Sequence, residues 1–302
     1  MQLNAYGKIT LSLKVIGKRS DGYHEVEQIM APILLCDTLE IRKTDKDIAF
    51  DCNIPELITN DNLCYLAAKK MLDMFQISSG LEITLHKRIP IKAGLGGGSA
   101  DGAAVLRAIN YLYDLNLSRE DLIKIGIQLG ADVPFCLCSE LSFISGIGER
   151  IKPIDTPLDY YVLIIKPKEG ISTKLCFDVL DANWAVKRSR YLNNEMKPDI
   201  NENLVNLQLC NDLEAPAISI LSEISNIKMQ LKSIGFDHVM MSGSGSCVIG
   251  ISNNINLIQY GEKLMKSKYP FVAITSAVKR ISDIDSKYAE LLQYEEKAHL
   301  CI

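Results

Sequence analysis

The sequence predicts an α+β protein built from two domains. Its 302 residues are too many for one ordinary small domain and suit two. The candidate elements run strands, helix, strand, glycine-rich loop, helix and helix, so they do not alternate as a doubly wound parallel sheet requires. The pattern changes near residue 159. We therefore expect a first domain over residues 1–158 and a second over 159–302.

Composition excludes several classes of protein. Hydrophobic residues make up 47% and charged residues 23%, the balance of a globular chain and not of a disordered one. The net charge of −4 argues against a nucleic-acid-binding surface. The longest apolar stretches, such as 160–165, are far shorter than the roughly 20 residues of a membrane span. The N-terminus has no basic region followed by an apolar core, so we expect a cytoplasmic protein that binds neither nucleic acid nor membrane.

The cysteines and histidines give no metal pattern. The nine cysteines are scattered singly, and the closest pair, Cys136 and Cys138, lacks the spacing of a zinc ribbon. Without an export signal, buried reduced thiols are expected instead of disulfides. No two of the four histidines have the spacing of metal ligands. A histidine-based metalloenzyme is therefore not expected.

The first domain opens with an alternating segment. Apolar and polar residues alternate over 8–15, which predicts a half-buried strand. Lys8 and Thr10 lie on its polar face, about 7 Å apart. A turn over 20–23 and a short strand over 39–42 follow.

Helical and strand periodicity continues through the first domain. It predicts a helix over 61–76, a strand over 81–86, a helix over 100–113 and a helix over 118–130. Asn60 and Asp61 are candidate caps of the first helix, and Ser118 with Asp121 forms a pattern similar to a capping box.

The second domain shows a different order of elements. The pattern predicts strands over 160–166, 238–241, 247–251 and 271–278, and helices over 216–232 and 256–268. Gly235 would close the first of these helices. Two strands joined by a small-residue turn, with flanking helices and a final strand, are typical of half a ferredoxin-like sandwich. The polar segment 185–203 is interpreted as a loop or insertion, and the tail after Ile281 as weakly helical.

A glycine loop is the strongest functional signal. Four glycines occupy five positions over 94–98, after a strand and before a helix. Glycine lets backbone N–H groups converge on an anion, and a helix N-terminus adds partial positive charge. The loop is therefore predicted to bind a polyphosphate. It lacks the Gly-Lys-Ser/Thr of a Walker A loop, and Ser99 replaces the third glycine of a dinucleotide fingerprint.

Four further features are weaker alone. Asp132 lies between two apolar segments, where a partly buried carboxylate needs a partner; turn N–H groups could equally satisfy it. Lys8 alone reads as a solvent-exposed lysine, and the segment 21–24 as a turn with an exposed aromatic. The segment 242–246 is either a tight turn or a second close approach of backbone to a ligand.

Taken together, these segments resemble the GHMP kinases over most of residues 4–280. The matching segments are Ala5–Leu11, Asp21–His24, Asp61–Leu63, Pro90–Ser99, Gly130–Phe135, Asn211–Glu214 and Ser242–Ser246. The Asp-Gly-Tyr-His segment and the Gly-Leu-Gly-Gly-Gly-Ser loop resemble the branch of this family that acts on a cytidine-diphosphate-linked polyol. The resemblance implies a ribosomal-S5-like N-terminal domain and a ferredoxin-like C-terminal domain, with the active site in the cleft between them.

The resemblance also implies residue roles. Lys8 and Asp132 match the catalytic lysine and aspartate, and Tyr23 and His24 match cytidine-binding positions. Thr173 and Phe177 would complete the cytidine pocket from the second domain. The expected ATP-binding residues are Pro90, Ile91, Lys92, Ala93, Gly94, Leu95, Gly96, Gly97, Gly98, Ser99 and Ala100. Mg²⁺ would bridge the nucleotide phosphates; its protein ligands are left open, with Ser99 the nearest candidate oxygen.

Two positions depart from the family pattern. Thr10 stands where the family has asparagine, so its contact to the polyol or to Asp132 would be weaker or water-mediated. Asp101 stands where asparagine is common, and we expect it to point outward from the first helical turn.

The resemblance implies an ATP-dependent kinase that phosphorylates the polyol's 2-hydroxyl in non-mevalonate isoprenoid precursor biosynthesis, as a monomer or weak homodimer. The alternatives are a GHMP-type kinase for another small alcohol and a non-catalytic nucleotide-binding protein on the same scaffold. A dinucleotide-binding oxidoreductase is disfavoured by the missing third glycine.

Overall fold

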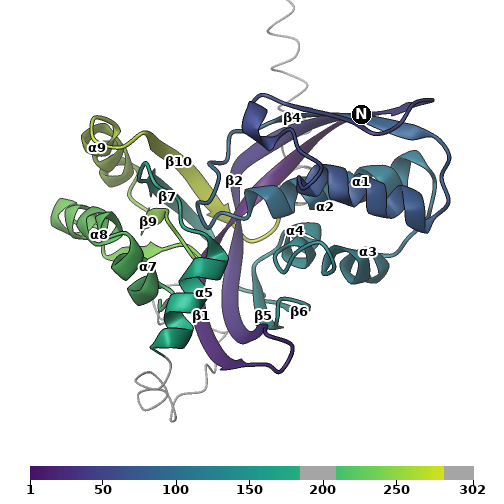
Figure 1. Ribbon diagram of the computed structural model, residues 1–302. Helices are drawn as coiled ribbons and strands as arrows, with labels where there is room; N and C mark the ends of the chain where they lie inside the picture. Colours follow the sequence, from purple (N-terminus) through teal and green to yellow (C-terminus); the bar gives the residue numbers. More distant parts are fainter. Residues whose placement is uncertain (184–208, 282–302) are drawn as a thin grey trace, which may run out of the picture.

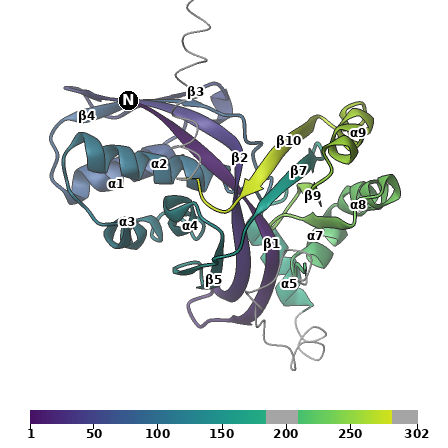
Figure 2. The same cartoon turned by 180° about the vertical axis from the view of Figure 1, so that it is seen from behind.

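The computed structural model describes residues 1–183 and 209–281, and Figures 1 and 2 show it from opposite sides. The polar segment predicted over 185–203 and the tail after Ile281 lie outside the described residues. Two long strands, β1 (Gln2–Lys18) and β2 (His24–Thr44), form an antiparallel hairpin that runs through the middle of the molecule. The predicted turn over 20–23 joins them, with Gly22 at a φ of 89°.

The remaining strands of the first half assemble around β2. They are β3 (Ala49–Cys52), β4 (Gly80–His86), β5 (Ser142–Gly146) and β6 (Arg150–Pro153). The last third of β2 pairs with β4 and its first third with β5, both antiparallel. Strand β3 is parallel to β4, and the connection between them contains a helix, as a parallel pair requires.

The helices of the first half pack on one side of this sheet (Figure 1). They are the 3-10 turn η1 (Pro55–Leu57), α1 (Leu63–Met74), α2 (Gly97–Leu112), α3 (Arg119–Gly126) and α4 (Val133–Cys138). Asn62, and not Asn60 or Asp61, caps α1 by accepting from the N–H of Cys64 at 2.9 Å. The capping box of Ser118 and Asp121 is confirmed at the start of α3. Helix α3 ends at Gly126, four residues earlier than predicted.

The second half has the complete topology of a ferredoxin-like sandwich, more than the half predicted. Its elements are β7 (Asp159–Lys166), α5 (Thr173–Ala182), α7 (Glu214–Ile220), α8 (Glu223–Ile234), β8 (His238–Met241), β9 (Val248–Ser252), α9 (Ile255–Lys266) and β10 (Phe271–Val278). The strand order β10-β7-β9-β8 is antiparallel throughout. The single helix predicted over 216–232 is two helices, because Leu221 adopts an extended conformation between them. Gly235 closes α8 with a φ of 109°, as predicted.

The two halves share one sheet. Strand β10 of the second half meets β2 where Ala277 pairs with Ile33, so the sheet continues from one half to the other. The domain boundary after residue 158, just before β7, stays a prediction. Within the described residues no helix is long and apolar enough to cross a membrane. All eight described cysteines are free and five of them are buried, as the composition predicted.

One face of β1 departs from the expectation. The segment 8–15 is a strand, but both of its faces are covered, so it is not half-buried. Lys8, Thr10 and Ser12 are respectively 3%, 0% and 1% exposed. The glycine loop and the turn 242–246 lie over this polar face, as the contacts of the site show.

Candidate active site

A cleft of about 970 Å³ lies between the two halves of the molecule. Both halves contribute to its lining. The predicted site residues that line it are Lys8, Tyr23, His24, Pro90–Ser99, Asp132, Thr173 and Phe177. The turn 242–246 contributes Gly243, Ser244 and Gly245. Residues from distant parts of the sequence therefore meet in one place.

A buried lysine and a half-buried aspartate face each other in this cleft. Lys8 Nζ lies 3.4 Å from Asp132 Oδ2, with the two side chains 3% and 31% exposed. Lys8 Nζ also donates to Thr10 Oγ1 at 3.1 Å. A buried ammonium is costly unless it has such partners, so Lys8 is held in place and is not a solvated surface lysine.

Asp132 is presented by the junction of two short helices. It is the N-terminal cap of α4, which Pro134 helps to start because proline suits the first turn of a helix. Its side chain makes no capping hydrogen bond, so local turn N–H groups do not satisfy it. Ser99 lies close by, since its Oγ is 3.9 Å from where a Cβ at Gly130 would stand. Oxygen donors from α2 and α4 thus converge at one point of the cleft.

The glycine loop adopts backbone conformations that favour glycine. Gly94 and Gly96 have φ values of 75° and 68°. A Cβ at Gly96 would stand 2.9 Å from Lys8 Cγ, so the loop lies directly against the lysine. Helix α2 begins at Gly97, inside the loop and three residues earlier than predicted. The positive end of a 16-residue helix dipole therefore points into the cleft.

The turn 242–246 supports the glycine loop from the other half. Ser242 Oγ donates to the carbonyl of Gly94 at 3.0 Å and accepts from the N–H of Thr10 at 3.2 Å. Asn211 Nδ2 donates to the carbonyls of Met241 and Gly243 at 2.9 and 2.7 Å. The turn thus lines the cleft and also connects the glycine loop to β1.

The cytidine-site candidates gather at the far end of the β1–β2 hairpin. Tyr23 is 58% exposed. His24 stacks on Phe177 of α5, with ring centroids 4.5 Å apart and planes at 21°. Thr173 Oγ1 lies 2.8 Å from Ser244 Oγ. These residues bring a stacking surface and hydroxyl groups to the cleft.

Two predicted site residues do not line the cleft. Thr10 is fully buried and accepts the hydrogen bond from Lys8, which makes it a support of that lysine. Ala100 is 2% exposed and packs inside the first turn of α2.

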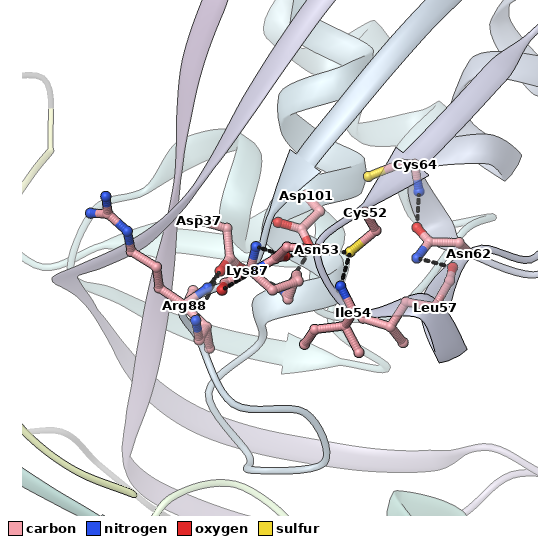
Figure 3. A network of polar contacts seen from close by, with 11 residues as sticks. Asp37, Cys52, Asn53, Ile54, Leu57, Asn62, Cys64, Lys87, Arg88 and Asp101 are labelled. Carbon is pink, nitrogen blue, oxygen red and sulfur yellow. Dashed lines mark hydrogen bonds and ion pairs between the residues drawn. The ribbon is translucent and has the colours of Figure 1, made fainter.

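A buried network of charges lies beneath the glycine loop (Figure 3). Lys87 forms ion pairs with Asp37 and with Asp101, the latter at 2.7 Å. Asp37 Oδ1 also accepts from the N–H groups of Arg88 and Ile89, at 2.5 and 2.8 Å. The expectation that Asp101 points outward was wrong: it is 2% exposed, because Lys87 draws its carboxylate inward.

This network contains one more carboxylate than it has ammonium groups to balance. Burial raises the pKa of Asp101 to about 7, while Lys87 opposes the rise and the carboxylate of Asp37 adds to it. One oxygen of Asp101, Oδ1, has no hydrogen-bond partner among the described residues. A protonated Asp101 would balance the remaining pair of charges.

We expect Asp101→Asn to become more stable relative to the unchanged chain as the pH rises. Because the pKa of Asp101 is raised on folding, the folded protein holds a proton that the unfolded chain has already released. The unchanged chain therefore loses up to about 1.4 kcal/mol of unfolding free energy per pH unit between about pH 4 and pH 7. The amide of the variant lacks this loss, and its oxygen can still accept from Lys87. Urea unfolding at about pH 5 and about pH 7 measures the difference, with the exposed Asp45→Asn as control. Parallel stability profiles for the variant and the unchanged chain would contradict the assignment.

The described residues hold no preformed metal cluster. No three histidine, cysteine, aspartate or glutamate side chains come together as ligands in the part of the chain that the structure describes. A divalent cation in this cleft would therefore take most of its ligands from a bound phosphate group and from water, as Mg²⁺ commonly does. Ser99 and Asp132 are the protein oxygens nearest to the glycine loop.

Sequence reasoning missed three polar residues of the site. Asp181 and Lys18 meet at His24, and Lys87 lies beneath the glycine loop. Asn211 was part of a matching segment, but only the structure gives it a role. For Lys87, the only available signal was its position between a strand and the loop. Nothing in the sequence around Asp181 distinguishes it from a surface residue.

Comparison with known proteins agrees with this geometry. The family model described as GHMP kinases N terminal domain matches residues 62–140, and the model described as GHMP kinases C terminal matches residues 192–266. A two-lobed fold, a glycine loop at a helix N-terminus and a lysine–aspartate pair in the cleft define a small-molecule kinase of this type. The chain belongs to the GHMP kinase family.

The similar proteins carry one particular name. A protein of Clostridium beijerinckii named 4-diphosphocytidyl-2-C-methyl-D-erythritol kinase is 39% identical over 282 residues, covering 92% of this chain and 100% of its own. A protein of Clostridioides difficile with the same name is 38% identical over 299 residues, covering 95% of this chain and 99% of its own. A crystal structure of 4-(cytidine 5'-diphospho)-2C-methyl-D-erythritol kinase superposes with a TM-score of 0.74 at 29% identity, covering 92% of this chain and 99% of its own.

Proposed function

We propose that this chain transfers the γ-phosphate of ATP to the 2-hydroxyl of 4-diphosphocytidyl-2-C-methyl-D-erythritol, a step of non-mevalonate isoprenoid precursor biosynthesis. The observation that carries the proposal is the placement of Lys8 and Asp132 at the glycine loop, in a cleft that also holds His24 and Phe177. Relatives at 38–39% identity over nearly the whole chain carry the name of this kinase.

Asp132 and Lys8 suit the chemistry of phosphoryl transfer. Asp132 accepts the proton of the attacking hydroxyl as its oxygen forms a bond to the γ-phosphorus and the bond to the leaving ADP breaks. Lys8, 3.4 Å from this carboxylate, orients it and adds positive charge where negative charge accumulates. Thr10 holds Lys8 in that position through its hydrogen bond at 3.1 Å.

The glycine loop fits a nucleotide polyphosphate. A Cβ at Gly98 would meet nothing nearer than 3.8 Å, so space is open above the loop at the start of α2. Backbone N–H groups of this helix start are free to bind phosphate oxygens. A magnesium ion bound with ATP would supply charge neutralisation for the phosphates, and Ser99 and Asp132 are the residues placed to hold it.

The far end of the cleft fits a cytosine base. Tyr23 and Phe177 provide aromatic surface, on which a base gains stacking energy. His24 adds a ring nitrogen that can form a hydrogen bond to the base. A cytoplasmic location and a monomer or weak homodimer stay predictions from the sequence.

Release of ADP in the presence of ATP, Mg²⁺ and a panel of alcohols tests this function. The panel is the cytidylyl methylerythritol, mevalonate, homoserine and galactose. We expect turnover only with the first. Turnover with another alcohol would keep the phosphate-transfer site but replace the substrate, and ATP binding without any turnover would favour a non-catalytic nucleotide-binding protein.

A further inference from the structure

A carboxylate from the second half holds His24 by one ring nitrogen. Nε2 of His24 lies 2.7 Å from Oδ1 of Asp181, which is close to the C-terminal end of α5. The imidazole is enclosed, with its side chain 9% exposed and one face stacked on Phe177. Since a carboxylate can only accept, Nε2 carries a proton in this contact.

The same carboxylate also binds a lysine. Lys18 Nζ donates to Oδ2 of Asp181 at 2.5 Å, from the opposite strand of the β1–β2 hairpin. These two contacts together lower the pKa of Asp181 although its partial burial raises it. Lys18 already balances the charge of the carboxylate, so the three groups carry no net charge when the imidazole is neutral. The arrangement therefore suits a neutral His24 with its proton on Nε2.

This contact decides what the other ring nitrogen can do. In a neutral imidazole one nitrogen donates and the other accepts, and the hydrogen bond made by one sets the role of the other. With Nε2 occupied by Asp181, any hydrogen bond from the ring to a ligand must come through Nδ1, and Nδ1 is then an acceptor. An acceptor at this position pairs with an amino group and is repelled by a carbonyl oxygen.

We propose that Asp181 is a positioning residue that determines base specificity, because it fixes the tautomer of His24 and so selects an amino-bearing pyrimidine over its keto analogue. This inference rests on the proposed function, which places the base of the substrate beside His24. Cytosine presents an amino donor at the position where uracil presents a carbonyl acceptor. A site whose enclosed acceptor faces another acceptor discriminates strongly, since neither group is satisfied.

Competition by CDP and by UDP against the cytidylyl substrate tests the specificity directly. We expect the unchanged chain to prefer CDP, and Asp181→Ala to lower the ratio of the two inhibition constants about tenfold, while KM for ATP stays unchanged. Asp178→Ala is the matched control, because it removes the same charge from an exposed position of the same helix. A general loss of structure would weaken both nucleotides equally. An unchanged ratio in Asp181→Ala would overturn the inference.

The tautomer can be measured without any turnover. The chain has only four histidines, so ¹⁵N spectra of the imidazole rings can be assigned with His24→Gln. We expect His24 to be protonated on Nε2 alone near neutral pH, and this signature to be lost in Asp181→Ala. Protonation on Nδ1, or on both nitrogens, would contradict the inference even in an active kinase. Conversely, the expected spectrum in a protein with no activity toward the cytidylyl substrate would overturn the proposed function and the specificity role, and leave only the contact.

Discussion

Asp132→Asn should lower kcat at least about 100-fold while KM for ATP changes little. Asparagine has nearly the same size as aspartate, but its amide cannot take a proton from the attacking hydroxyl. A general base of this kind contributes about 10² to 10⁴ in rate. Asp132 is half-buried at the cap of α4 and makes no capping hydrogen bond there, so its loss should not disturb the helix. The measurement is steady-state kinetics with the cytidylyl substrate and ATP, together with thermal unfolding.

The effect must separate catalysis from binding. A fall in kcat and in kcat/KM by the same factor indicates an interaction made only in the transition state. Asp73→Asn makes the same chemical change on the exposed side of α1 and should leave kcat as it is. If Asp132→Asn turned over at the unchanged rate, Asp132 would not be the base, and Lys8 would have a different partner in the reaction.

Local periodicity was sufficient for the regular elements of the fold. The alternation over 8–15 and the helical pattern after the glycine loop correctly predicted parts of β1 and α2, because each buries one apolar face. The elements missed were short or irregular in pattern. Helix α4 has six residues, five of them buried, and such a short apolar run does not distinguish a helix from a strand. The first half of β2 was missed because buried and half-buried residues follow one another without alternation.

The site was predictable to a similar extent. Glycine spacing indicated the phosphate loop, since glycine is required where φ is positive or backbone approaches backbone. The burial of Asp101 was not predictable, because its partner Lys87 lies 14 residues away and Asp37 lies on a different strand. Contacts between the halves, such as that of Asp181 with His24, depend on tertiary structure alone. For these residues, the sequence contains polar side chains but no local sign of what they bind.

The largest effect on stability should come from Gly94→Ala. Gly94 has a φ of 75°, which costs a residue with a side chain about 1–3 kcal/mol. Its Cβ would also stand 1.9 Å from the carbonyl oxygen of Ser242 and 3.0 Å from the N–H nitrogen of Gly245. These are backbone atoms of the other half, so the loop or the turn 242–246 must move. We expect the free energy of unfolding to fall by about 2 kcal/mol or more, and kcat/KM to fall with it.

Gly98→Ala provides the matched control in the same loop. Gly98 has no positive φ, and a Cβ there would stand 3.8 Å from Leu63 Cδ1, an ordinary van der Waals contact. Alanine is about 1 kcal/mol more favourable than glycine inside a helix, so this variant should be as stable as the unchanged chain or more stable. Urea unfolding of both variants makes the comparison. If Gly94→Ala were as stable as Gly98→Ala, the glycine loop would not be packed against the turn 242–246, and the two halves would not be joined at this point of the cleft.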